Sequence, residues 1–333
     1  MHVGMAAGAV IAIMAATGVA QAAEDYAVVD RIAGPDGGWD YLRVDPDHNQ
    51  LLIPRGAAVM TVDLATRKIA TGLAAGGRQH VALPLPGGRE MLVTNGATDT
   101  ATFADEATGA LLASVPVAKG PDAAALDPKS GLVVVAGHAG GAVTLVDPRT
   151  RRAVGDIQVG GTLEEVAADG RGRVFVNVED RNEIAVVDVG ARKTVAHWPL
   201  KGCEGPTGLA YDPDDRLLIA ACDGVTVLVR ASDGKLVQTL KTGQGADGAA
   251  YDARRRRAFV PAGRDGTLSV IAIEKGHASV VQTLRTDVGA RTLALDERTG
   301  RIYLPAAEYR PSPQGGRPTP LPGTFRVLVV APK

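Results

Sequence analysis

The sequence has few aromatic residues, almost no cysteine and no excess of either charge. Phe, Trp and Tyr make up 4% of its 333 residues, there are two cysteines, and 36 basic residues face 37 acidic ones. Cys203 and Cys222 lie far apart, which excludes the Cys-x-x-Cys-His motif that attaches c-type haem. A formal net charge of −1 gives no general electrostatic reason to expect nucleic acid or an anionic membrane as the main partner.

Glycine and proline, in contrast, are abundant. The chain holds 41 Gly and 20 Pro, and 45% of it is hydrophobic, which is enough to bury a core. This composition predicts many short strands joined by tight turns and argues against a helical bundle. The length alone would permit two domains, but large all-β architectures often form one unit of this size.

The first 23 residues have the composition of a signal peptide. Residues 5–19 are small and apolar, and Ala20-Gln21-Ala22 forms an A-x-A cleavage site. We therefore predict a signal peptide over residues 1–23 and export to the periplasm, where oxidising conditions allow the two cysteines to pair. The alternative is an uncleaved anchor, because no Lys or Arg precedes the apolar stretch.

A turn motif recurs about every 40 residues through the rest of the chain. Each copy is flanked by short runs rich in Val, Ile and Leu, and such runs between turn residues are typical of strands. Four runs per repeat predict a seven-bladed β-propeller, all-β, with four-stranded blades and one domain over residues 24–333. The turns begin at Asp45, Leu85, Asp127, Asp169, Asp212, Asp252 and Asp296.

The last repeat lacks its fourth strand, and the beginning of the mature chain supplies a candidate. Residues 26–32 form an apolar run that includes Tyr26, Val28 and Val29. We expect this run to pair beside residues 325–330 and close the ring, because an open ring would leave an unpaired strand edge.

Aligning the repeats places one residue of each blade at the mouth of the central channel. The innermost strand of each blade begins at this face, called the top face below, and the turn motifs lie on the opposite, bottom face. Four mouth residues are acidic and one is basic. The mouth positions are Asp40, Gln79, Asp122, Glu164, Thr207, Asp247 and Arg291, with His80 next to Gln79.

Several segments resemble the YVTN-type propellers and the YncE-like secreted proteins of proteobacteria. The YVTN pattern is carried by residues 120–128 and 140–147, and the YncE-like one by residues 38–42, 203–210, 289–296 and 301–308. The resemblance covers essentially the whole mature chain and implies an exported propeller. It implies no catalytic motif, and related propellers include dehydrogenase subunits, lactonases and binding modules.

A divalent metal ion is the one cofactor that the mouth suggests. Asp40, His80 and Asp122 occupy neighbouring positions, and carboxylates with an imidazole suit such an ion. The alternative is a solvated polar funnel. Only His80 and His138 of the six histidines fall on the top face, which is too few for a multinuclear copper ring. The chain has only two tryptophans, whereas pyrroloquinoline quinone (PQQ) sites in propeller dehydrogenases use a tryptophan-rich repeat, so PQQ is disfavoured.

Two further segments each have two interpretations. Residues 254–257 are four arginines in a bottom turn, which suggests a nucleic-acid surface, but acidic residues share these turns and no aromatics interleave. A solvated turn face is therefore favoured.

The Pro-rich loop at residues 309–323 in blade 7 leaves the top face, where it either drapes over the mouth or forms a surface loop.

These observations favour a non-catalytic binding propeller, expected as a monomer, that uses its top face for a protein or a small ligand. The alternatives are an enzyme, lactonase-like or associated with a dehydrogenase, and a nucleic-acid-binding protein. We also predict a disulfide between Cys203 and Cys222, which the strand register brings together at the top of blade 5 and which the YncE-like resemblance supports.

Overall fold

The structure, a computed structural model, describes residues 1–2, 25–310 and 319–333. The predicted signal peptide, Met1 and His2 apart, and residues 311–318 of the Pro-rich loop lie outside the described residues. No helix in the described ranges is long and apolar enough to span a membrane.

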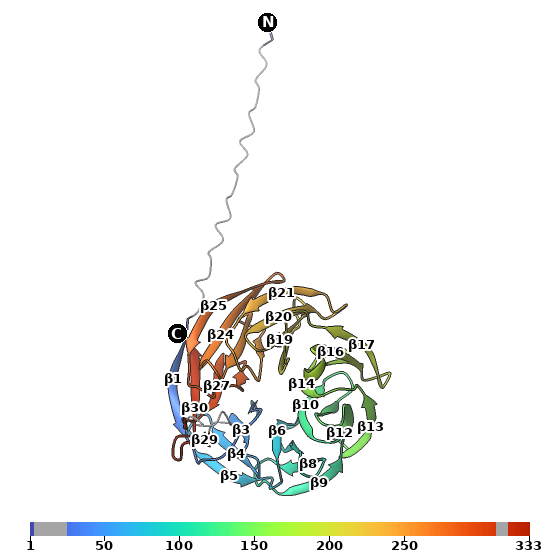
Figure 1. Cartoon of the computed structure of the whole chain (residues 1–333), viewed down its shortest axis with the longest axis vertical. Helices are drawn as coiled ribbons and strands as arrows, with labels where there is room; N and C mark the ends of the chain where they lie inside the picture. Colours follow the sequence, from blue (N-terminus) through green and yellow to red (C-terminus); the bar gives the residue numbers. More distant parts are fainter. Residues whose placement is uncertain (3–24, 311–318) are drawn as a thin grey trace.

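The described chain forms seven four-stranded antiparallel sheets arranged as blades around a ring, which confirms the predicted β-propeller (Figure 1). In blades 1 to 6 the four strands follow one another from the channel outward. Blade 1 contains β2 (Arg43–Asp45), β3 (Gln50–Pro54), β4 (Val59–Asp63) and β5 (Ile69–Leu73); blade 2 contains β6 (Gln79–Pro84), β7 (Glu90–Asn95), β8 (Thr100–Asp105) and β9 (Leu111–Pro116); blade 3 contains β10 (Pro121–Asp127), β11 (Leu132–Gly137), β12 (Ala142–Asp147) and β13 (Arg152–Gln158).

The other four blades follow the same plan, with one exception in blade 7. Blade 4 contains β14 (Leu163–Ala168), β15 (Arg173–Val178), β16 (Glu183–Asp188) and β17 (Lys193–Pro199); blade 5 contains β18 (Gly208–Asp212), β19 (Leu217–Ala221), β20 (Val225–Arg230) and β21 (Leu236–Lys241); blade 6 contains β22 (Ala250–Asp252), β23 (Arg257–Ala262), β24 (Thr267–Glu274) and β25 (His277–Arg285); blade 7 contains β26 (Ala294–Asp296), β27 (Arg301–Ala306), β30 (Arg326–Pro332) and β1 (Tyr26–Ala33).

The ring closes as the sequence predicts, because β1 pairs antiparallel with β30. Tyr26 lies opposite Pro332 and Ile32 opposite Val327, and both side chains are buried. The prediction for Val29 is wrong: its side chain is 53% exposed. A register shift between Val28 and Asp30 leaves Val29 in a β-bulge, which turns it away from the sheet interior.

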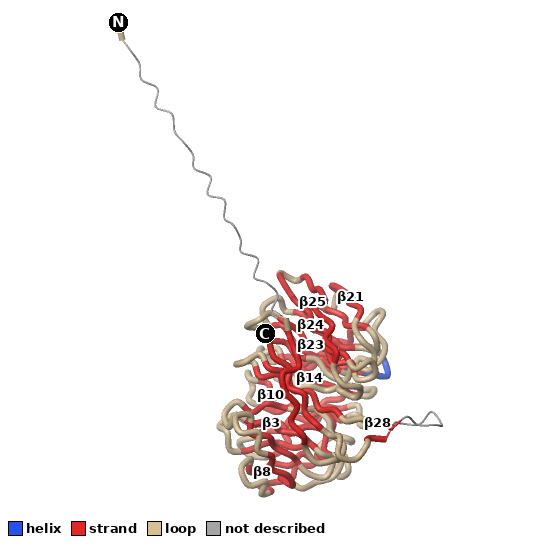
Figure 2. Tube along the Cα trace, turned by 90° about the vertical axis from the view of Figure 1, so that its left-hand side faces the viewer, coloured by secondary structure: helices blue, strands red, loops and turns tan. Residues whose placement is uncertain are grey.

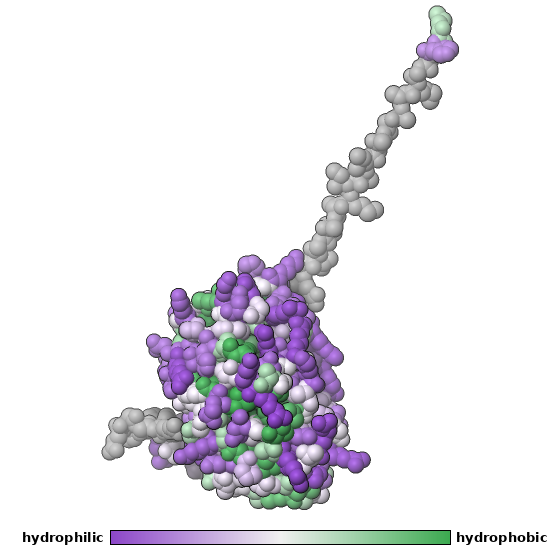
Figure 3. All heavy atoms as spheres, turned by 90° about the vertical axis from the view of Figure 1, so that its right-hand side faces the viewer, coloured by the Kyte–Doolittle hydropathy of each residue, from purple (hydrophilic) through white to green (hydrophobic). Residues whose placement is uncertain are grey.

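The core lies between the blades and is built mainly by the two middle strands of each. In β11, for example, five of the six residues from Leu132 to Gly137 are buried, whereas the outer strand β17 alternates between exposed and half-buried side chains. The difference arises because β11 is covered on both faces by neighbouring blades, whereas β17 is covered on one face and meets solvent on the other. Most large hydrophobic side chains that stay exposed therefore lie on outer strands: Leu111, Leu112, Val195, Leu236, Val237 and Val281. Figure 3 shows hydrophobic side chains among hydrophilic ones on one side of the ring.

Two local features define the top face. A 3₁₀ turn (Glu179–Arg181) connects β15 to β16, and β28 (Tyr309–Arg310) pairs with β29 (Thr319–Pro320) between β27 and β30. Both lie on the same side of the disc (Figure 2). The turn motifs lie on the bottom. Four of them begin with a buried Asp that accepts backbone N–H groups two and three residues on, as Asp127 does from Lys129 and Ser130. The other three such Asp residues are Asp45, Asp212 and Asp252.

Candidate functional site

Three consecutive inner strands begin at the channel mouth with an irregular register. The pairing shifts between Gln79 and Ala82 in β6, between Pro121 and Ala123 in β10, and between Leu163 and Val166 in β14. A β-bulge re-aims the side chains within it. The shifted segments contain His80, Asp122 and the pair Glu164 and Glu165, so these side chains can face the channel.

Five side chains form a continuous row of alternating acids and histidines along the mouth. We call Asp40, His80, Asp122, His138 and Glu164 the mouth row. His80 Nδ1 lies 2.7 Å from Asp40 Oδ2 and 2.8 Å from Asp122 Oδ1, and His138 Nδ1 lies 2.9 Å from Glu164 Oε1. The possible ligand atoms of each of two triads lie within 4.8 Å of one another, and Asp122 belongs to both.

Each imidazole of the mouth row pairs with a carboxylate through Nδ1. His80 Nδ1 makes a hydrogen bond with Asp40, and its contact with Asp122 is an ion pair. His138 Nδ1 forms an ion pair with Glu164 Oε1. A metal ion that binds here would replace the protons of these pairs.

Burial and the neighbouring charges shift the ionisation of the mouth row. Burial raises the pKa of Asp40 and of Glu164, and the nearby histidines only partly offset it. Burial acts to lower the pKa of His80, but its interactions with Asp122 and Asp40 outweigh burial and raise it to about 10. The Glu164 carboxylate raises the pKa of His138. At neutral pH, His80 therefore carries a proton in a position between two carboxylates.

Below the mouth row, two contacts cross the channel from blade 1 to blade 4. The Tyr41 hydroxyl donates to Glu164 Oε2 at 3.2 Å, and Arg43 Nη2 donates to Glu165 Oε1 at the same distance. Blades 2 and 3 separate these blades on one side of the ring, and blades 5 to 7 on the other. Burial raises the pKa of Glu165 to about 7, and Arg43 opposes this shift.

Replacing Arg43 with Met is expected to destabilise the protein more as the pH rises. A free Glu side chain has a pKa of about 4.3, so the higher folded-state pKa means that stability falls as Glu165 loses its proton. Without Arg43 that pKa rises further. We expect the free energy of unfolding to fall by about 2 kcal/mol at pH 8 and to change little near pH 5. The loss is smaller than the roughly 3–5 kcal/mol typical of breaking a fully buried ion pair, because Arg43 is partly exposed.

Urea unfolding at both pH values measures this difference. Adding Glu165→Gln to Arg43→Met removes the uncompensated charge and should restore most of the loss at pH 8. An equal loss at pH 5 and pH 8 in the single variant would show that Arg43 acts through packing alone.

The remaining predicted mouth residues point elsewhere or pair with each other. The Gln79 side chain is buried and donates to the Ala74 carbonyl at 2.6 Å, and the Thr207 hydroxyl donates to the Ala246 carbonyl at 2.9 Å. Arg291 Nε donates to Asp247 Oδ2 at 2.6 Å. Burial raises the pKa of Asp247 well above its ordinary value, and Arg291 opposes this. The structure thus gathers Asp40, His80, Asp122 and Glu164 into the row, with Asp247 and Arg291 as a separate pair.

Sequence reasoning missed His138 as a neighbour of Glu164, and it missed Tyr41, Arg43 and Glu165. His138 was placed on the top face, but its partner could not be identified because it lies on the loop after β11 and reaches the next blade. The adjacent acids Glu164 and Glu165 at the start of an inner strand were the available signal for the cross-channel contacts.

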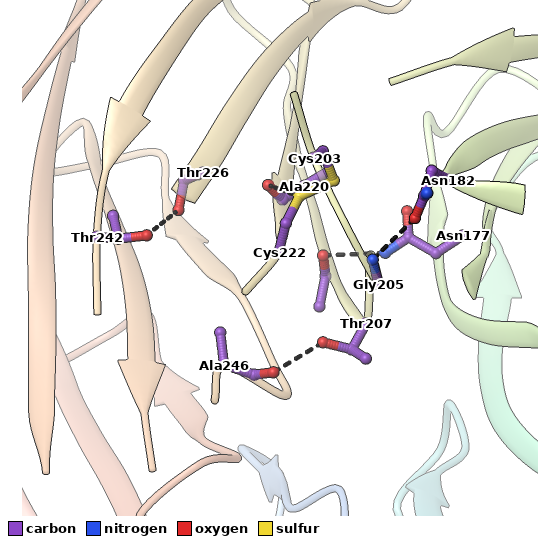
Figure 4. The surroundings of a disulfide bond; sticks show 11 residues. Asn177, Asn182, Cys203, Gly205, Thr207, Ala220, Cys222, Thr226, Thr242 and Ala246 are labelled. Atoms are coloured by element: carbon purple, nitrogen blue, oxygen red, sulfur yellow. Dashed lines mark hydrogen bonds between the residues drawn. A yellow bond between two sulfur atoms is a disulfide. The ribbon is translucent and has the colours of Figure 1, made fainter. Parts of the chain in front are cut away.

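The predicted disulfide between Cys203 and Cys222 is present, with a Cα–Cα distance of 5.4 Å (Figure 4). It joins the link into β18 to the residue after β19. Two hydrogen bonds hold the same link to neighbouring blades: Gly205 N–H donates to Asn182 Oδ1 of blade 4, and Thr207 donates to Ala246 before blade 6. The bridge therefore fixes one side of the mouth.

The bottom face offers different chemistry. A cavity of about 460 Å³ is lined there by Tyr211, Tyr251, Pro128 and Pro213 together with several alanines. Two of the four consecutive arginines are held by neighbouring acids, Arg255 by Asp252 and Arg256 by Asp214 and Asp215. These pairs agree with a solvated turn face and leave less charge for a nucleic-acid backbone.

The comparisons with known proteins identify the fold. No family model matches the sequence, and no curated protein matches it. Among solved structures, a chain of hydrazine synthase from Kuenenia stuttgartiensis superposes with a TM-score of 0.70 at 14% identity, covering 82% of this chain and 94% of that one. A chain of the mitotic checkpoint complex superposes with a TM-score of 0.74 at 12% identity and covers 99% of both chains. At these identities the likeness shows the β-propeller fold alone.

Proposed function

We propose that this protein is an exported, non-catalytic binding propeller whose channel mouth binds a divalent metal ion or a ligand presented on one. The YncE-like resemblance and the disulfide support export to the periplasm. The observation that carries the proposal is the mouth row, in which three carboxylates and two imidazoles converge so that the ligand atoms of each triad lie within 4.8 Å of one another.

The charge balance of the mouth favours cations. Four acidic side chains, those of Asp40, Asp122, Glu164 and Asp247, outnumber one permanently charged cation, Arg291, and Arg291 already pairs with Asp247. The two histidines balance the other acids only while they carry protons. A divalent ion would replace those protons, so binding should release protons and strengthen as the pH rises.

The spacing of the row also suits a metal. Bonds of about 2.1 Å place neighbouring ligand atoms about 3.0 Å apart around an octahedral ion and about 3.4 Å apart around a tetrahedral one. The 2.7–2.9 Å contacts between the histidines and the acids need to widen only slightly to reach these spacings. Mixed nitrogen and oxygen ligands favour Zn²⁺ or Mn²⁺ over Ca²⁺. Because Asp122 belongs to both triads, it is the residue whose loss should affect binding most.

Calorimetric titration of chelator-treated protein with Zn²⁺ and Mn²⁺ tests the proposal. We expect binding with proton release, weakened at least about 100-fold by Asp122→Asn. Asp265→Asn is the matched control, because Asp265 lies on the same face outside the row and accepts a backbone hydrogen bond. Phosphate and a small dicarboxylate serve as anionic probes. Tighter binding of an anion, lost in Arg291→Ala, would reverse the proposed preference.

The second candidate function is hydrolysis, and the shared Asp122 is the observation that favours it. In two-metal hydrolases a pair of ions stabilises the attacking and leaving oxygens. Two ions bound per mouth, together with turnover of a lactone or phosphoester that is lost in Asp122→Asn, would favour this candidate over pure binding.

A further inference from the structure

One buried acid on the bottom face breaks the pattern of the repeat. In five blades, a residue at the end of the third strand or directly after it donates its N–H to the carbonyl that precedes the second strand. The equivalent residues are Leu64, Glu106, Val189, Ala231 and Ile273, with N···O distances of 2.9–3.1 Å. Four are apolar. Glu106, only 2% exposed, places a carboxyl group where the fold otherwise uses an apolar side chain.

Glu106 meets the first turn of the neighbouring blade. We call Asp45, His48, Gln50 and Glu106 the bottom cluster. His48 Nδ1 lies 2.7 Å from Asp45 Oδ2 and 3.9 Å from Glu106 Oε1, and Gln50 Nε2 donates to that same oxygen at 2.9 Å. Blade 1 supplies three members and blade 2 supplies Glu106. The candidate ligand atoms of Asp45, His48 and Glu106 lie within 4.8 Å of one another.

Glu106 and Asp45 bring two carboxyl groups together inside the protein. Glu106 Oε2 is buried and accepts no hydrogen bond from a donor among the described residues. Burial and a hydrogen bond with the adjacent Asp45 raise the pKa of Glu106 to about 7. Burying an acid in this way costs stability unless something pairs with it, and an apolar side chain at the same position would avoid the cost.

We propose that the bottom cluster is a second divalent-metal site, which joins blade 1 to blade 2 through Asp45, His48 and Glu106. An ion would replace the proton that Asp45 and Glu106 share and would bind both carboxylates at once. His48 remains partly exposed, so water can complete the coordination from solvent. One imidazole with two carboxylates suits Zn²⁺ and similar transition ions better than Ca²⁺ or Mg²⁺, which prefer oxygen ligands alone.

The test measures Zn²⁺ binding and thermal unfolding of the full protein, carrying no histidine tag, in a background with His80→Gln, Asp122→Asn and His138→Gln. This background removes both imidazoles of the mouth row and the carboxylate shared by its two triads, so the outcome does not depend on the proposed function. We expect one bound Zn²⁺ and a raised Tm. Glu106→Leu should weaken binding at least about 100-fold and yet, without metal, raise Tm by about 2–4 °C, because it restores the apolar residue of the repeat.

Two further variants complete the test. His48→Gln should also lose the site, whereas His277→Gln, at an exposed histidine in another bottom turn, should leave it unchanged. Glu106→Gln replaces Glu106→Leu if the latter does not fold. Zn²⁺ binding that is absent from the background, or that is unchanged by both His48→Gln and the Glu106 substitution, would overturn the proposal.

Discussion

Deletion of residues 25–34, which carry β1, is expected to abolish cooperative unfolding or to cause aggregation. The deletion strips blade 7 of its outer strand and exposes the edge of β30 to other chains. It also removes Tyr26, which is 1% exposed and packs edge-on against Phe259 with ring centroids 5.0 Å apart. The Gln282 side chain, which bonds both the N–H and the carbonyl of Tyr26, loses both partners.

Calorimetry and size-exclusion chromatography compare this deletion with a chain that begins at Asp25. Two substitutions refine the comparison, because Tyr26→Ala should cost about 3–5 kcal/mol whereas Val29→Ala, in the exposed bulge, should cost almost nothing. A deletion variant that elutes as a monomer and melts like the longer chain would disprove closure by β1.

Replacing Gly208 with Ala is expected to be the most damaging single-methyl addition at the mouth. A Cβ at this position would lie 2.3 Å from the carbonyl carbon of Gly248 and 2.6 Å from the backbone nitrogen of Ala249. Because both obstacles are backbone atoms of the next blade, no side-chain rotation relieves the clash. We expect a loss of at least about 3 kcal/mol in the free energy of unfolding.

Gly38→Ala is the matched control, because a Cβ there meets nothing within 4 Å. Both variants add one methyl group to the top part of the chain, so denaturant unfolding isolates the effect of the close approach between blades 5 and 6. Equal stability of the two variants would mean that the inner strands of these blades lie further apart than the structure shows.

The fold was predictable because each repeat carries the same local signals. Asp turns such as Asp127 and Asp212 cap their own backbone, and the runs of Val and Leu between them are long enough for strands but not for helices. The missing fourth strand of the last repeat predicted the pairing of β1 with β30. The disulfide was predictable too, although Cys203 lies on the link before β18 and not directly opposite Cys222 in the strand register.

The mouth was predictable in its residue types but not in its contacts. The bulges at His80, Asp122 and Glu164 shift the alternation of the inner strands, and one-residue shifts of this kind leave no clear signal in a single sequence. This is why Gln79, one residue before His80, was assigned to the mouth while its side chain bonds Ala74. The same shift at Val29 made an exposed residue look like part of an apolar stripe.

Long-range pairs lie beyond sequence reasoning for a different reason. Arg43 and Glu165 are 122 residues apart and belong to blades that are not neighbours. Only the completed ring brings them together, because each lies on an inner strand facing the channel. The bottom cluster is easier to find than such a pair but harder than the fold. Glu106 stands out as the one acidic residue at its position only when the blades are aligned on their backbone hydrogen bonds.

Anomalous diffraction from crystals soaked with Mn²⁺ or Zn²⁺ shows whether the mouth row binds a divalent ion, because it locates each ion without assuming a ligand. We expect a peak within about 2.5 Å of an Asp122 carboxylate oxygen and of an imidazole nitrogen of His80 or His138. Such a peak should vanish in Asp122→Asn. If no peak appears at the mouth, at an ion concentration that saturates the protein in solution, the mouth row is not a metal site.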